Sequence, residues 1–204
     1  MNARLDFTAR RLSQPPNRGW REAADPATTD VAVLANRRVL LLADAQNLSF
    51  SLRKRQTDCD YAALLGAIRK VAHQVTAHAF AWVEAGEEER YAQKYFEKAG
   101  WVPHIWQNQH VLAHDGTRHR MNCDSSMLLW GGSLISRTRA DAVVLATGDG
   151  DLAGDMLHFM RELRTPRTPV VMGVAGCISS RLQPAHTPEI AAVIALGRDV
   201  MVRF

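Results

Sequence analysis

The sequence is poor in cysteine and has no long apolar run. Its three cysteines, Cys59, Cys123 and Cys177, lie far apart, and none belongs to a CxxC motif. We therefore expect neither a disulfide framework nor a structural zinc site, and a reducing cytoplasm is the expected compartment. No apolar stretch approaches the ~20 residues that a membrane helix needs, and no apolar segment near Met1 resembles a secretion signal. We expect a cytoplasmic protein that has no membrane partner.

Basic residues are unevenly distributed along the chain. The 204 residues include 25 Lys plus Arg against 21 Asp plus Glu, a formal net charge of +4. Residues 1–38 hold seven arginines and four acidic residues, and the Pro15–Pro16 and Asp25–Pro26 steps interrupt regular structure there. We expect residues 1–37 to be a flexible basic extension and residues 38–204 to be one folded domain. A basic balance is common in proteins that bind nucleic acid.

Apolar runs alternate with helical patterns from residue 38 onward. The runs that we expect to form strands are 39–43, 77–83, 101–106, 142–146, 169–174 and 199–204. Helical spacing of apolar residues predicts helices at 61–72, 87–99, 124–136 and 152–163. The Asp115–Gly116 step predicts a hairpin within residues 110–121. This alternation predicts an α/β fold, a Rossmann-like three-layer sandwich with a mostly parallel central sheet.

Isolated carboxylates follow two of the apolar runs. Asp44 directly follows run 39–43, and Asp149 and Asp151 follow run 142–146. In a doubly wound sheet the first and fourth strands are commonly neighbours, and ligands bind beyond their carboxyl ends. Carboxylates that meet there repel one another, and Mg²⁺ or Mn²⁺ would relieve the repulsion. Asp124, at the start of a predicted helix, would be a fourth carboxylate on the same rim.

Each of these residues also has a purely structural interpretation. An aspartate after a strand is commonly a turn residue or a helix N-cap, a role that suits Asp151 ahead of Leu152 and also suits Asp124. Asn47, taken alone, is a turn residue. The coincidence of two strand-terminal acidic motifs is what favours a metal site.

The motifs around these aspartates resemble those of NYN domains, which belong to the PIN-like nuclease superfamily. Asp44-Ala-Gln-Asn47-Leu is similar to the D-x-x-N-L element that opens these domains, and Thr147-Gly-Asp-Gly-Asp-Leu is similar to their (S/T)-G-D-x-D-(F/L) element. Asp124 occupies the place of the middle aspartate of the family's K-G-x-D element. The resemblance covers about residues 38–174. It implies a PIN-like fold and a metal-dependent endoribonuclease that hydrolyses RNA phosphodiester bonds.

Three features depart from the family pattern. Met121 replaces the usual lysine, although Arg120 stands beside it, and Trp130 occupies a place where a further acid is common. Residues 179–182, Ser-Ser-Arg-Leu, are similar to the family's S-x-x-L element, but the aspartate that often follows is missing.

The resemblance implies a role for each site residue. Asp44, Asp124 and Asp149 would ligate Mg²⁺ or Mn²⁺. Asp151 would add a ligand or orient the attacking water, and Asn47 would hydrogen-bond Asp44 or the phosphate. The residues expected to contact RNA are basic or carry a hydroxyl group: Arg53, Lys54, Arg55, Arg118, Arg120, Thr147 and Ser179. PIN-like domains commonly pair, which implies a homodimer.

Two other functions compete with the nuclease. The departures at Met121 and Trp130 favour a non-catalytic RNA-binding or assembly module that keeps the fold. A phosphatase of the haloacid-dehalogenase type needs D-x-D directly after its first strand, whereas this chain reads Asp44-Ala-Gln, so we discount it.

The tryptophans divide into two expected groups. We expect Trp82 and Trp130 to be packed in the core, and Trp101 or Trp106 to stack on a base or a partner.

Overall fold

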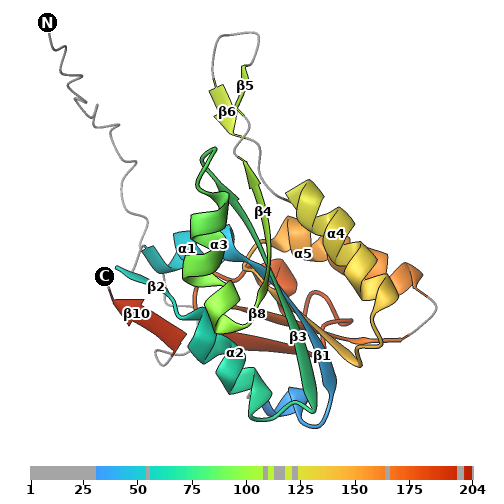
Figure 1. The fold of residues 1–204 in the computed structure, drawn as a ribbon. Helices are drawn as coiled ribbons and strands as arrows, with labels where there is room; N and C mark the ends of the chain where they lie inside the picture. The colour runs from blue at the N-terminus through green and yellow to red at the C-terminus, as the bar shows by residue number, and fades with distance from the viewer. Residues whose placement is uncertain are drawn as a thin grey trace, which may run out of the picture.

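The structure is a computed structural model that describes residues 31–53, 56–107, 110–112, 118–120, 124–163, 166–196 and 200–203. In this part of the chain, the main sheet has six strands, and every neighbouring pair is parallel. The strands, in spatial order, are β4 (Val102–Gln107), β3 (Gln74–Val83), β1 (Arg38–Asp44), β7 (Ala142–Ala146), β8 (Thr168–Val174) and β9 (Ala192–Leu196). The predicted parallel sheet is confirmed (Figure 1).

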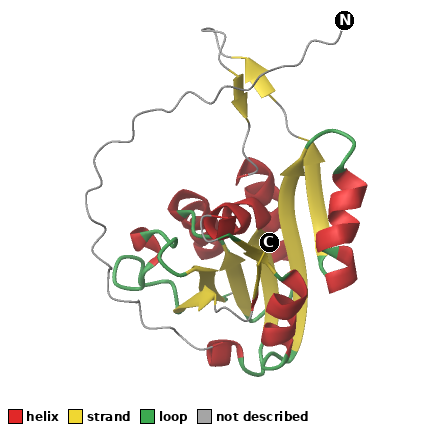
Figure 2. Cartoon of the chain, turned by 90° about the vertical axis from the view of Figure 1, so that its left-hand side faces the viewer, coloured by secondary structure: helices red, strands yellow, loops and turns green. Residues whose placement is uncertain are grey.

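Helices cover both faces of the sheet (Figure 2). One face packs against α1 (Ala45–Arg53), α2 (Tyr61–Arg69) and α3 (Glu88–Tyr95), and the other against α4 (Asp124–Arg137) and α5 (Gly150–Glu162). Short 3-10 helices are η1 (Val31–Leu34), η2 (Glu97–Ala99) and η3 (Ser180–Leu182). The chain is therefore an α/β three-layer sandwich, as its sequence predicts.

The central strand β1 explains why the sandwich has two cores. Successive side chains of a strand point to opposite faces. Leu41 and Ala43 join the core under α1, α2 and α3, whereas Leu40 and Leu42 join the core under α4 and α5. The continuous apolar run that predicts a strand buried on both faces is therefore the physical centre of the molecule.

Two small antiparallel sheets lie outside the main one. β5 (His110–Leu112) pairs with β6 (Arg118–Arg120), so the predicted hairpin is confirmed. β10 (Met201–Arg203) pairs with β2 (Thr57–Cys59). The expectation that 199–204 supplies the sixth strand of the main sheet is therefore wrong, because β9 fills that position.

The folded domain begins before residue 38. Leu34, in η1, is fully buried in the core under α2, and Arg37 donates a hydrogen bond from Nη1 to Thr168 Oγ1 at 2.6 Å. The expected extension is therefore too long by the segment 31–37, because an apolar side chain anchors that segment. Residues 1–30 lie outside the described residues.

A membrane-spanning helix is not found: in the described part of the chain, every helix is too short or too polar to cross a bilayer.

Candidate active site

The carboxyl ends of β1 and β7 lie side by side. Ala43 is in register with Ala146, so Asp44 and Thr147, the residues that follow, lie at the same edge of the sheet. The expectation that these two strands are neighbours is confirmed. Helix α1 starts directly after Asp44, and α5 starts three residues after Thr147. The two acidic motifs of the sequence therefore lie next to each other at the carboxyl edge of the sheet.

Asp44 is the buried carboxylate of this site, with 4% of its surface exposed. Its Oδ1 accepts a hydrogen bond from the backbone N–H of Asn47 at 3.0 Å, and its Oδ2 accepts one from Thr147 Oγ1 at 3.3 Å. The pKa of Asp44 is raised to about 6, chiefly by burial and also by the charges of Asp124 and Asp149, while the two hydrogen bonds oppose the rise. Three of the four predicted carboxylates are thus close enough to act on one another.

Asn47 joins the two motifs. Its Oδ1 accepts a hydrogen bond from the backbone N–H of Gly148 at 2.7 Å, which ties α1 to the loop between β7 and α5. The role expected for the Asn47 side chain was a bond to Asp44 or to phosphate, but its carbonyl oxygen holds the loop, and it is the backbone of Asn47 that contacts Asp44.

Gly148 is packed so closely that it has no room for a side chain. A Cβ there would overlap the backbone carbonyl oxygen of Cys177, in the loop after β8. The N–H of Ser179 donates to the Gly148 carbonyl oxygen at 3.0 Å. A Cβ on Gly150 would lie 2.6 Å from Ser179 Oγ, so this serine also lies at the site, as expected.

Asp149 is the N-cap of α5. Its Oδ1 accepts hydrogen bonds from the backbone N–H groups of Asp151 at 2.8 Å and Leu152 at 3.2 Å. Its own N–H donates to Thr147 Oγ1 at 3.1 Å. The interpretation of Asp151 as the cap is therefore wrong, because the chain turns into the helix two residues earlier.

Asp151 lies at the surface rather than beside Asp44. Its Oδ1 accepts a hydrogen bond from Arg181 Nη1 at 2.7 Å, and the two side chains are 86% and 75% exposed. The charges that raise the pKa of Asp44 are those of Asp124 and Asp149. Asp124 and Asp149 therefore lie near enough for their charges to act on Asp44, whereas Asp151 is set apart in an ion pair with Arg181.

The expected RNA-binding residues are dispersed. Arg53 ends α1, about 12 Å along the helix axis from its start. It lies near Tyr91 of α3, where its charge partly offsets the rise in the pKa of Tyr91 caused by burial. Arg118 and Arg120 belong to β6. Lys54 and Arg55 lie outside the described residues.

Sequence reasoning missed Arg181 as a basic residue of the rim. It follows Ser179 and Ser180 in the element that resembles S-x-x-L, and it reaches the first turn of α5 across 30 residues of sequence. The signal in the sequence that could have identified Arg181 was its position within the S-x-x-L-like element.

The tryptophans are arranged differently from the expectation. Trp82 is buried, as expected. Trp101 is also buried, and its Nε1 donates to the carbonyl oxygen of Tyr61 at 2.8 Å, so it cannot stack on a base. Trp130 is 53% exposed, so the expectation that it is packed in the core is wrong. It precedes Gly131, where α4 packs closely against Leu42 of β1 and Met156 of α5.

The site around Asp44 offers carboxylate and hydroxyl oxygens, which suit a hard cation. In the described ranges, no three His, Cys, Asp or Glu side chains are grouped closely enough to hold one metal ion together. Mg²⁺ does not require such a cage, because it keeps several waters and commonly binds one or two carboxylates. The buried Asp44, with its raised pKa, gains most from a nearby positive charge. The donor set therefore fits Mg²⁺ or Mn²⁺.

No protein-family profile matches the chain, and no curated protein matches it. Among solved structures, the chain is similar to the crystal structure of a protein of unknown function from Vibrio parahaemolyticus, with a TM-score of 0.63 and 18% sequence identity. The similarity covers 82% of this chain and 97% of that chain. At this identity it shows the fold alone, which is the α/β sandwich described above.

Proposed function

We propose that the protein is a Mg²⁺- or Mn²⁺-dependent endoribonuclease. The observation that carries the proposal is Asp44, a buried carboxylate at the junction of β1 and β7 whose pKa is raised by burial and by the charges of Asp124 and Asp149. The hydrogen bond from the Asn47 N–H also caps the start of α1, but a neutral asparagine or serine would fill that role without the cost of burying a charge. The motifs that resemble NYN domains supply the substrate class.

Asp44 would hold the cation, and Asp124 and Asp149 would act on it through its bound waters. The cation, when bound, would supply an activated water and offset charge on the scissile phosphate. Thr147 and the backbone of Asn47 orient the Asp44 carboxylate through their hydrogen bonds. The Asn47 side chain holds the Gly148 loop, so the positions of Thr147 and Asp149 depend on it.

Asp151 forms an ion pair with Arg181, and the guanidinium group of Arg181 could bind a phosphate instead. Exposed ion pairs contribute about 0–1 kcal/mol to stability, so this pair opens at little cost. Arg181 would then contact an RNA phosphate beside the pocket, and Asp151 would be released toward the bound water.

An RNA cleavage assay tests the proposal. Single-stranded and structured RNAs are incubated with the protein in Mn²⁺, Mg²⁺ or EDTA, and wild type is compared with Asp149→Asn. Asparagine is also a good N-cap, so α5 keeps its cap while the charge is lost. We expect the substitution to lower the cleavage rate about 100-fold or more, since a metal ligand matters at least as much as its supporting residues.

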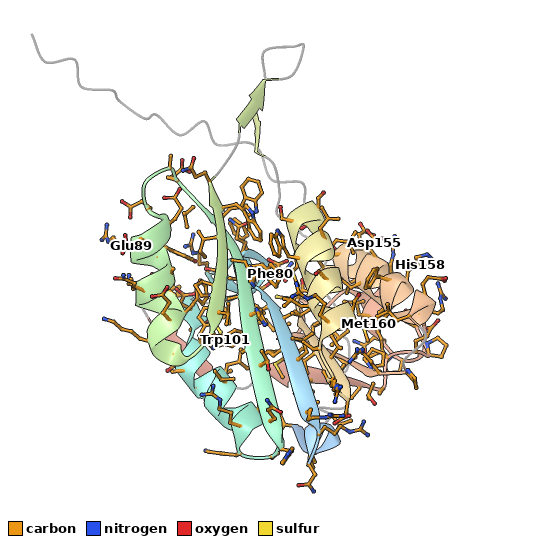
Figure 3. The ribbon with its side chains drawn as sticks, turned by 45° about the vertical axis from the view of Figure 1, so that its right-hand side comes forward. Phe80, Glu89, Trp101, Asp155, His158 and Met160 are labelled. Atoms are coloured by element: carbon orange, nitrogen blue, oxygen red, sulfur yellow. The ribbon has the colours of Figure 1, made fainter. Side chains whose placement is uncertain are left out.

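Asp155→Asn is the matched control. Asp155 lies on the same helix and is exposed (Figure 3), so this variant also loses one negative charge from α5. It should cleave RNA at the wild-type rate. Cleavage that is indifferent to both EDTA and Asp149→Asn contradicts the proposal.

A non-catalytic RNA-binding module is the second candidate. It is favoured by the pairing of Asp151 with Arg181, which occupies one of the four aspartates. RNA binding without cleavage in any of the metals would select it.

A further inference from the structure

Aromatic rings are stacked beside Asp44, on the face of the sheet that α4 covers. His104 lies parallel to Phe80, with ring centroids 4.7 Å apart and an interplanar angle of 10°. Trp106 is stacked with His104 at 6.2 Å, and Trp130 of α4 approaches His104 at 6.0 Å. We call Phe80, His104, Trp106 and Trp130 the aromatic cluster. Figure 3 shows Phe80, its innermost member, on the side of the sheet that faces α4.

The register of the sheet ties this cluster to the pocket. Asp44 is paired with Phe80, and Phe80 with His104, so the three residues share one level across three strands. Residues in register on parallel strands point to the same face. Two strand spacings separate Asp44 from His104, about 10 Å. A nucleotide next to a phosphate held at Asp44 can span that distance.

The cluster becomes more exposed as it extends outward from the sheet. Phe80 is fully buried, His104 and Trp106 are partly exposed, and Trp130 is 53% exposed. A half-exposed tryptophan in ring contact with its neighbour presents a large apolar area to solvent. A flat aromatic ligand would cover this area by extending the stack.

The surface of the cluster is uncharged at neutral pH. His78 Nδ1 and His104 Nε2 are 2.9 Å apart and share a hydrogen bond, and burial lowers the pKa of both rings, that of His78 to about 4. Neutral rings suit the face of a nucleobase rather than a phosphate. The β5–β6 hairpin follows β4 along the chain (Figure 1), and its sequence includes Arg118 and Arg120.

We propose that His104, Trp106 and Trp130 form a base-stacking site for an unpaired nucleobase of the strand whose phosphodiester bond lies at the acidic pocket. This proposal rests on the proposed function, in which a phosphate of the RNA lies at Asp44. Asp44 is about 10 Å from His104, which is two strand spacings. It predicts a preference for single strands, since the faces of paired bases are already stacked.

Equilibrium binding of a ten-nucleotide, fluorescein-labelled single-stranded RNA in EDTA tests the site without cleavage. Trp130→Ala should weaken binding about tenfold, the effect expected from the loss of one base–aromatic contact. Trp130→Phe keeps a ring and should restore affinity to within about threefold of wild type. Leu129→Ala is the matched control, because Leu129 is the adjacent residue of α4, is 74% exposed and has no ring. It should bind like wild type.

The wild-type protein provides a second measurement that needs no variant. An RNA of the same length with abasic nucleotides keeps its phosphates and loses its ring faces. Wild type should bind it about tenfold more weakly than the intact RNA, and Trp130→Ala should bind the abasic strand as wild type does.

The outcomes separate this site from the nuclease proposal. Equal affinities of Trp130→Ala and Leu129→Ala, a Trp130→Ala defect that persists on the abasic strand, or no binding of the RNA overturn the stacking site. If Trp130→Ala has a lower mass than wild type in analytical ultracentrifugation, the stacking site is also overturned. The aromatic cluster would then be a contact between two copies of the chain. Binding that depends on Trp130 without cleavage in any metal supports the site and contradicts the nuclease.

Discussion

Burial raises the pKa of Asp44 from 3.8 to about 6, with the charges of Asp124 and Asp149 adding to the rise. The folded-state pKa lies above the unfolded-state value, so folding favours the protonated form. The contribution of Asp44 to stability is therefore fully present below pH 3.8 and is lost as the pH rises through about 6. The loss is about 3 kcal/mol, from 1.36 kcal/mol for each pKa unit.

Asp44→Asn should remove this loss. Asparagine can still accept the hydrogen bond from the N–H of Asn47 and donate to Thr147 Oγ1, but it carries no charge. In EDTA, we expect the variant to gain about 3 kcal/mol of unfolding free energy relative to wild type between pH 4 and pH 7. Urea denaturation at several pH values measures this difference. A difference that stays constant across the range would show that Asp44 is not the titrating group.

At the scale of elements, the site is a junction of three segments. α1, the β7–α5 loop and the loop after β8 meet at Gly148, where Asn47 Oδ1 and the Ser179 N–H both bind its backbone. Asp44 is hydrogen-bonded to α1 and to the β7–α5 loop, and Gly148 to α1 and to the loop after β8. Rearrangement at the junction would displace Thr147 and Asp149 together.

Gly148→Ala should therefore disturb both stability and catalysis. Its Cβ would overlap the Cys177 carbonyl oxygen, which is backbone and cannot turn aside. We expect a destabilisation of about 1–3 kcal/mol and a loss of RNA cleavage. Gly154→Ala on α5 is the control, because nothing lies within 4 Å of the added Cβ. It should stabilise the protein by about 0.5–1 kcal/mol in thermal unfolding. Equal melting temperatures for the two variants would contradict the tight junction.

The elements that the sequence predicts well are those with an unambiguous period. β1 and β7 are continuous apolar runs, so the polar residues at the end of each run mark the carboxyl edge of the sheet. β9 is not predicted, because residues 190–196 are apolar and rich in alanine, which does not distinguish a short strand from a helix. Helix α1 is also missed: Ala45, Leu48 and Leu52 recur at helical spacing, but the segment has only nine residues and contains the polar Gln46–Asn47 step near its start.

The candidate site is predicted only as far as strand order determines it. Because β1 and β7 are neighbouring parallel strands, Asp44 and Asp149 lie close together irrespective of their side-chain contacts. The ion pair of Asp151 with Arg181 and the exposure of Trp130 depend on contacts between residues distant in the chain. Such contacts leave no periodic pattern in the sequence. The arrangement of the residues that surround Asp44 at the surface can therefore be assigned only from the structure.

At the scale of the whole molecule, acidic and basic regions have separate tasks. The formal net charge is +4, yet the buried Asp44 lies close to the charges of Asp124 and Asp149. Under the proposed function, these carboxylates would repel nucleic acid and the basic residues elsewhere would attract it. A divalent cation in the pocket would offset the local negative charge and let the basic surface govern the approach of a phosphate backbone.

Cation binding should therefore be visible in the stability of the whole fold. A ligand that binds only the folded state stabilises it by about 2.7 kcal/mol at a concentration 100 times its dissociation constant. At pH 8 Asp44 is ionised, so Mn²⁺ should raise the melting temperature, and at pH 4.5, where Asp44 is protonated, the increase should vanish. Asp44→Asn should show little increase at either pH, whereas Asp155→Asn should respond like wild type. Thermal unfolding in Mn²⁺ and in EDTA measures each case without any RNA. A melting temperature at pH 8 that is the same in Mn²⁺ and EDTA would mean that the pocket binds no cation, and the buried charge of Asp44 would then need another partner.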